Sequence, residues 1–180
     1  SLDDEEEYSI DVIQPEKIEF KQNSYEDGEN SIISFPEFLL LVLDVCTGGE
    51  QPASHYQPDK LIEKFDALKT YFTAGEFYEK MLYYRLLLDY YTIRRDIKDG
   101  QGNYSLILKG PKDDSDKLKQ YQSMLYVSTE AFYNWLKPYL RKLEQDELHS
   151  CAEMLAFLKK GDNERHSILP ARKDLSYKAS

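Results

Sequence analysis

The sequence has few of the residues with which enzymes perform chemistry. It contains three histidines and two cysteines, and no Gly-rich phosphate loop, nucleophile motif or paired metal ligands. His55 is expected on the surface of a loop. His149, Cys151 and Glu153 form the one mixed metal-capable cluster, but positions two apart on a helix point in different directions and chelate one ion poorly. We therefore predict no catalytic residue, no metal site and no cofactor.

Basic residues are also in deficit. The chain has 33 Asp and Glu against 23 Lys and Arg, which gives a net charge of −10. This balance opposes binding to the phosphate backbone of nucleic acid, for which clustered Lys and Arg are needed. The cluster of Lys137, Arg141 and Lys142 is small and is interleaved with Glu144 and Asp146. The chain as a whole is therefore a poor candidate for binding DNA, although a local basic face is compatible with it.

Signals for secretion and for membrane insertion are missing from the sequence. The N-terminus reads Ser-Leu-Asp-Asp-Glu-Glu-Glu, without a basic start or an apolar run, so it is no signal peptide. The most apolar helix would place four charged side chains within a bilayer. Cys46 and Cys151 lie in apolar helical contexts, which favours free thiols over a disulfide. We expect a cytoplasmic protein without a membrane partner, and the missing initiator Met favours a fragment of a longer one.

The sequence does contain enough apolar residues to form one hydrophobic core. These residues make up 41% of the 180, and their distribution divides the chain into three parts. Residues 1–31 read as an acidic linker, with a loop at 23–31 and an edge strand near Ile18 and Phe20. Residues 32–161 form the helical domain, and residues 162–180 a polar, frayed tail. A short strand at 104–108 is a candidate partner for the strand at 18–20.

Start and stop signals delimit six helices between residues 34 and 161. Three pairs have the spacing of a capping box: Ser34 with Glu37, Thr73 with Glu76, and Ser150 with Glu153. Ser128-Thr129 separates the fourth helix from the fifth and caps the latter. Pro138 lies inside the fifth helix and predicts a kink or a boundary near Lys137. Gly161 is expected to end the last helix.

The chain is organised around its third helix, predicted over residues 74–95. One face carries Phe77, Met81, Tyr84, Leu88 and Tyr91 at helical spacing. Two further faces are also apolar, so we expect other helices to surround this one. The predicted fold is mainly α, an irregular multi-helix bundle around a long central helix, with room for one small β-hairpin.

The candidate contact residues lie at the end of this helix. Arg85, Asp89 and Thr92 form its polar line, and Arg94 and Arg95 are placed in its last turn, where cations complement the helix dipole. Arg85 and Asp89 form either an ion pair four residues apart or a polar site that faces a partner domain. The 15 tyrosines offer stacking platforms for a single strand, but most lie at core spacing, which favours packing.

Four stretches within residues 32–145 share a common pattern of helical packing residues: Ser34–Leu41, the apolar-aromatic helix of Phe77–Arg95, Leu118–Ser128 and Trp135–Leu140. Together these stretches resemble the helical middle region of the GmrSD-type restriction proteins. In that family an N-terminal ParB-like domain handles nucleotide and a C-terminal HNH domain cuts DNA, often modified phage DNA. The ParB-like domain carries an Asp-Gly-Gln-Gln-Arg-type motif. The Asp-Gly-Gln-Gly-Asn run at 99–103 departs from that motif at its fourth and fifth residues, and we interpret it as a turn. No HNH constellation can be assembled from the three histidines, so no catalytic residue is carried over.

The resemblance implies a non-catalytic connector domain that couples a nucleotide-responsive ParB-like domain to an HNH nuclease domain. Its partners would be the flanking domains of the same chain, with DNA reached indirectly through a parent protein that is a nucleotide-dependent endonuclease. Two alternatives stay open. One is a module that binds single-stranded or duplex DNA, and the other is a free-standing protein-interaction domain.

Overall fold

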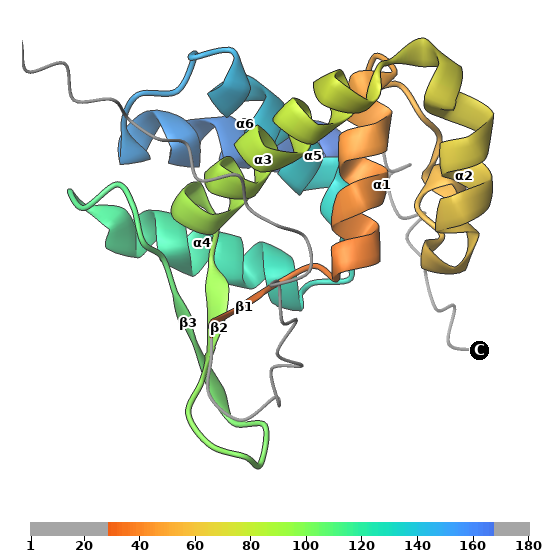
Figure 1. Cartoon of the computed structure of the whole chain (residues 1–180). Helices are drawn as coiled ribbons and strands as arrows, with labels where there is room; N and C mark the ends of the chain where they lie inside the picture. The colour runs from red at the N-terminus through yellow and green to blue at the C-terminus, as the bar shows by residue number, and fades with distance from the viewer. Residues whose placement is uncertain (1–28, 168–180) are drawn as a thin grey trace, which may run out of the picture.

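The computed structural model describes residues 29–167, which are mainly helical, as the sequence predicts (Figure 1). In these residues six α-helices are joined by short 3-10 turns and accompanied by a three-stranded antiparallel sheet. The helices are α1 (Phe35–Cys46), α2 (Leu61–Leu68), α3 (Ala74–Tyr91), α4 (Ser115–Val127), α5 (Phe132–Glu144) and α6 (Cys151–Ser167). The strands are β1 (Glu29–Ser31), β2 (Arg94–Ile97) and β3 (Tyr104–Ile107).

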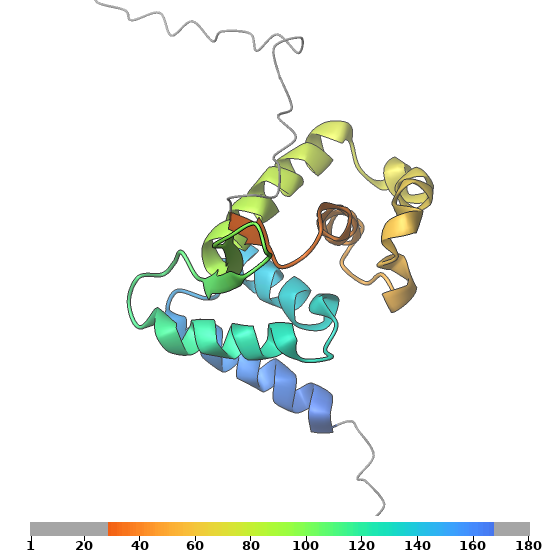
Figure 2. The ribbon, with the colours of Figure 1, turned by 90° about the horizontal axis from the view of Figure 1, so that it is seen from below.

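The most deeply buried helix is α1. Its residues Leu40, Leu41, Val42 and Leu43 are completely buried. Figure 2, which looks nearly along α1, shows it between α3 and α2, and it contacts both. The capping box that was predicted at its start is present, because the Ser34 hydroxyl accepts from the Glu37 amide and the Glu37 carboxylate accepts from the Ser34 amide.

The expectation that other helices surround α3 is wrong for the described part of the chain. The face that carries Phe77 and Tyr84 lies against the core: Tyr84 and Leu88 are buried, and Phe77, Met81 and Tyr91 pack against it. The opposite face is open, because its large apolar side chains are exposed. Its large exposed side chains are Tyr78, Leu82, Tyr83, Leu86 and Tyr90.

The third helix is also shorter than predicted, since α3 ends at Tyr91 and the chain is extended at Thr92. The buried side chain of Gln122 explains this end. Its Nε2 donates to the Tyr91 carbonyl at 3.0 Å, and its Oε1 accepts from the Ile93 amide at 2.9 Å. The Tyr139 hydroxyl donates to the same Tyr91 carbonyl at 2.9 Å. These bonds satisfy backbone groups that the helix would otherwise pair, so the chain can leave the helix inside the core.

The small β-hairpin allowed by the sequence consists of β2 and β3, which extend away from the helical body (Figure 1). The 99–103 run forms the turn between them, where Asp99 accepts hydrogen bonds from the Gln101 and Asn103 amides. β1 pairs with β2, so the end of the predicted 23–31 loop is a strand. The predicted strand at 18–20 lies outside the described residues.

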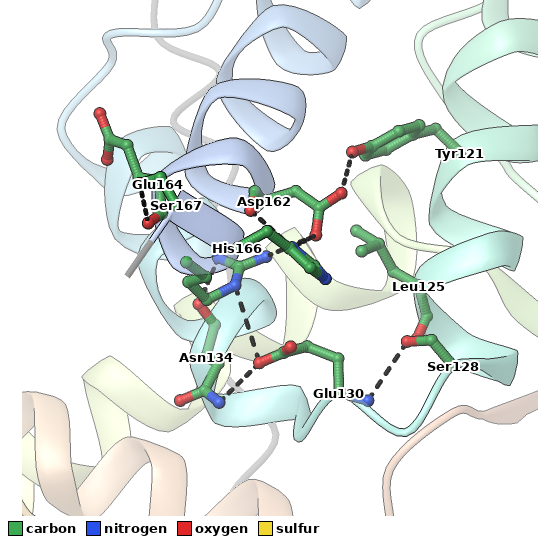
Figure 3. Close-up of polar contacts among 10 residues, drawn as sticks. Tyr121, Leu125, Ser128, Glu130, Asn134, Asp162, Glu164, His166 and Ser167 are labelled. Carbon is green, nitrogen blue, oxygen red and sulfur yellow. Dashed lines mark hydrogen bonds and ion pairs between the residues drawn. The ribbon is translucent and has the colours of Figure 1, made fainter. Parts of the chain in front are cut away.

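The last helix continues through Gly161 to Ser167, so residues 162–167 are not part of a tail. Figure 3 shows the contacts that hold this last turn to α4 and α5. The Tyr121 hydroxyl donates to Asp162 at 2.8 Å, and Arg165 forms ion pairs with Asp162 and Glu130, both at 3.7 Å. Glycine disfavours a helix by only about 1 kcal/mol. The contacts of Tyr121 and Arg165 are sufficient to offset this cost of a glycine in the helix. Residues 168–180 of the predicted tail lie outside the described range.

No boundary occurs at Pro138, because α5 runs without interruption from Phe132 to Glu144. Proline has no amide proton for the carbonyl four residues earlier, which belongs to Asn134. That carbonyl accepts from Nη1 of Arg165 at 3.1 Å instead. The predicted cap at Ser128-Thr129 is also wrong, since Ser128 ends α4 and α5 begins after Ala131.

Candidate functional site

Three of the four predicted contact residues come together at the end of α3. Nε of Arg85 lies 2.9 Å from Oδ2 of Asp89, which confirms the predicted ion pair four residues apart. Nη1 of Arg94 lies 3.9 Å from Oδ1 of the same carboxylate. The Arg85 guanidinium also lies over the ring of Phe38. Asp89 thus joins α3 to β2 and helps to fix the direction in which the hairpin leaves the helix.

Arg95 is separate from this group. Neighbouring residues of a strand point to opposite faces, so Arg95 in β2 faces away from Arg94. Its Nη2 donates to the Ser31 carbonyl at 3.3 Å, and its guanidinium lies over the Tyr104 ring. The predicted position of both arginines in a last helical turn is therefore wrong. The four residues do not form one site, and they connect α3 with the sheet.

A second polar group, not anticipated from the sequence, is buried beside α1. The fully buried carboxylate of Asp44 accepts from Lys137 Nζ and from the Gln51 amide, both at 2.9 Å, and from the Tyr56 hydroxyl. Burial, followed by the hydrogen bond to Asp44, raises the pKa of Tyr56, so its phenol remains a donor. Lys137 Nζ also donates to the Gly49 carbonyl at 3.1 Å. This network fixes the loop after α1 to α5.

His55 lies in the same loop and is buried, contrary to the surface position expected for it. Its Nε2 is 2.7 Å from the Leu40 carbonyl, and a carbonyl only accepts, so Nε2 carries the proton. Burial is the main cause that lowers the pKa of His55. The neutral imidazole therefore acts as a link between the loop and α1.

An open cleft of about 630 Å³ lies between the ends of α1 and α5 and the first half of α3. Aromatic and acidic side chains line much of it. They are Tyr71, Phe72 and Tyr83, and Glu76, Glu79 and Glu144. We call this the aromatic-acidic cleft.

The interior of the cleft is ordered by Glu144. One carboxylate oxygen pairs with Lys80 Nζ and the other accepts from the Tyr84 hydroxyl. Cys46 also lines the cleft, and burial is the main cause that raises its pKa, although Lys80 acts in the opposite direction. A thiol with a raised pKa is mostly protonated at neutral pH, and the nucleophilic form is the thiolate. The arrangement therefore favours binding over nucleophilic chemistry.

Next to the cleft lies the exposed apolar face of α3, formed by Tyr78, Leu82, Tyr83, Leu86 and Tyr90, each between 42% and 67% exposed. Tyr83 belongs to both surfaces. Apolar residues all round the helix are a sequence signal for this face, but the pattern does not show that one side stays uncovered. Only part of the cleft had a signal in the sequence, the aromatic pair Tyr71 and Phe72 before Thr73. Glu144 joins the cleft from α5, and no local pattern indicates that contact.

Comparisons with known protein families, with characterised proteins and with solved structures found no match. Within residues 29–167, no group of three or more His, Cys, Asp and Glu side chains is arranged to hold a metal ion. No helix of that range is long and apolar enough to cross a membrane. The two candidate binding surfaces of the described residues are the aromatic-acidic cleft and the exposed apolar face of α3.

Proposed function

We propose that this chain is a connector domain, which binds neighbouring protein domains and performs no catalysis itself. The observation that carries the proposal is the exposed apolar face of α3. Contiguous exposed apolar patches are uncommon on monomers and often mark interaction sites. A partner that covers these side chains gains roughly 25 cal/mol of binding free energy for every Å² of apolar surface removed from water.

The composition and rigidity of α3 support this role. The face contains three tyrosines and two leucines, and aromatic residues are enriched at protein interfaces. The helix is held against the rest of the fold at its middle, where Lys80 and Tyr84 contact Glu144 of α5, and at its end, where Gln122 and Tyr139 donate to the Tyr91 carbonyl. A helix held at its middle and end can transmit the movement of one bound domain to another.

The identity of the neighbours rests on the resemblance to GmrSD-type restriction proteins. On that basis the neighbours are a nucleotide-responsive ParB-like domain and an HNH nuclease domain of one cytoplasmic parent protein. The connector would hold the two against each other and transmit closure between them. DNA would be contacted by the parent protein, in keeping with the net charge of −10 on this chain.

The complete coding sequence tests this assignment first. We expect a ParB-like domain encoded upstream and an HNH domain downstream, in the same reading frame. A reading frame with neither domain would contradict the connector role.

The second test uses the full-length parent protein with Leu82→Glu and Leu86→Glu combined. Both side chains are exposed, so the fold should tolerate the change, which circular dichroism checks. We expect DNA cleavage to lose its dependence on nucleotide, because a charged face no longer binds its neighbour. Val127→Glu is the matched control, since Val127 is an exposed apolar residue at the end of α4. Unchanged coupling in the double variant would contradict the proposal.

A further inference from the structure

We propose that the aromatic-acidic cleft binds a cationic side chain, a lysine or an arginine, from the protein segment that covers α3. The cleft combines three aromatic rings with three carboxylates, against a single cation, Lys80. Aromatic faces attract organic cations through the negative potential of the ring, and carboxylates add charge attraction and hydrogen bonds. The same lining repels phosphate and carboxylate ligands.

The three carboxylates differ in how far they are already used. Glu144 is paired with Lys80 and bonded to Tyr84. Glu76 accepts from the Thr73 amide at 2.7 Å, and this capping interaction lowers the pKa of Glu76, so the group stays ionised. Glu79 has no hydrogen-bond or ion-pair partner in the described part of the chain. It is the carboxylate that is available to an incoming cation.

The aromatic wall is partly prearranged. The Phe72 ring is stacked on Phe77 at 5.4 Å between centroids and meets Phe65 at 5.8 Å, so it is held from behind. Tyr71 and Tyr83 also line the cleft and are exposed. Such a site can surround the apolar stem of a lysine or arginine while its charged end reaches Glu79.

The position of the cleft identifies a polypeptide as the source of the cation. One line along α3 carries four residues that follow one another at steps of four, three and four positions. They are Glu79, Tyr83, Leu86 and Tyr90. A segment that lies on the apolar face therefore brings its next residue to the mouth of the cleft. This inference rests on the proposed function, and it adds that the bound segment has a basic residue beside apolar ones.

The test uses the 180-residue chain and two small probes, N-acetyl-arginine amide and its uncharged analogue N-acetyl-citrulline amide. Binding is followed by NMR, through the shifts of the Tyr71, Phe72 and Tyr83 ring signals. We expect the arginine probe to shift these signals and the citrulline probe to leave them unchanged. Glu79→Gln should raise the dissociation constant of the arginine probe about fivefold, as expected for the loss of one partly exposed charge pair. Glu63→Gln, an exposed acid on α2, is the control and should change nothing.

Equal shifts with both probes, or equal affinity in Glu79→Gln and the parent chain, would overturn the cation site. The connector proposal can fail separately. If the arginine probe binds as expected but Leu82→Glu with Leu86→Glu leaves nucleotide coupling intact, the cleft binds cations without the α3 face serving as a connector surface. If coupling is lost but the probe does not bind, the connector proposal stands and the cation site is wrong.

Discussion

Replacing Lys137 with methionine should destabilise the protein strongly, although the two side chains are similar in length. Among residues 29–167 the Lys137 ammonium group is the only cation bonded to Asp44, whose side chain is 0% exposed, and Lys137 itself is 16% exposed. Breaking a buried ion pair by removing one partner costs roughly 3–5 kcal/mol, because the other charge stays buried. Two donors to Asp44 remain, from Tyr56 and Gln51, so we expect the lower end, about 3 kcal/mol.

Urea unfolding at pH 7, followed by circular dichroism, measures this loss. In a chain of this size about 3 kcal/mol corresponds to a melting temperature lower by roughly 6–12 °C. Lys142→Met is the matched control, because Lys142 lies on the same helix and pairs with Glu147 at the surface. That change should cost less than about 1 kcal/mol.

A second variant tests the physical reason directly. Adding Asp44→Asn to Lys137→Met removes the unpaired charge and leaves a side-chain oxygen that accepts from Tyr56. The double variant should therefore be more stable than Lys137→Met alone by at least about 1 kcal/mol. The account of this network would be refuted if Lys137→Met matched Lys142→Met, or if Asp44→Asn lowered the stability further.

Three further outcomes are expected. Arg165→Met should cost about 2 kcal/mol by urea unfolding, and Pro138→Ala should recover part of this by giving the Asn134 carbonyl an amide donor; no recovery would contradict that role. Gly110→Ala should displace the Tyr90 ring, because a Cβ would lie 2.1 Å from its Cζ; the ring is 42% exposed and can swing aside, so we expect its NMR signals to shift at a cost below about 1 kcal/mol, whereas Gly100→Ala, in open space, should leave these signals unchanged, and equal effects would refute the close approach. Burial, followed by the hydrogen bond to Asp162, raises the pKa of Tyr121 from 10.0 to about 12, so its stabilising contribution is complete below pH 10 and is lost as the pH rises through about 12. Tyr121→Phe should flatten the fall in unfolding free energy across this window, and an unchanged slope would count against the assignment.

The sequence predicted the helices better than the tertiary contacts that each of them makes. Six helices and the strand at β3 follow from local signals such as the boxes at Ser34 and Thr73, because those signals act within one turn of the chain, whereas β2 was predicted as the end of the third helix. The end of α3 could not be predicted in this way. It depends on Gln122, a residue 31 positions away from the Tyr91 carbonyl to which it donates. Local pattern does not reveal such a partner.

The candidate site was only partly visible in the sequence. Spacing alone predicted the Arg85–Asp89 pair, since both lie on one helix. The aromatic-acidic cleft depends on α5 placing Glu144 against Lys80, which lies 64 residues earlier. The exposed face of α3 was missed for a related reason, because an apolar helix indicates burial only if other elements are present to cover it.

Photo-cross-linking from position 86 of the full-length protein tests the central claim most directly. A photoreactive phenylalanine analogue replaces Leu86, and in a matched control it replaces Val127, which is also exposed. We expect the probe at position 86, and not the probe at 127, to capture a peptide from a domain outside residues 29–167, identified by mass spectrometry. Capture confined to residues 1–28 of the same chain, or no more capture at 86 than at 127, would contradict the account.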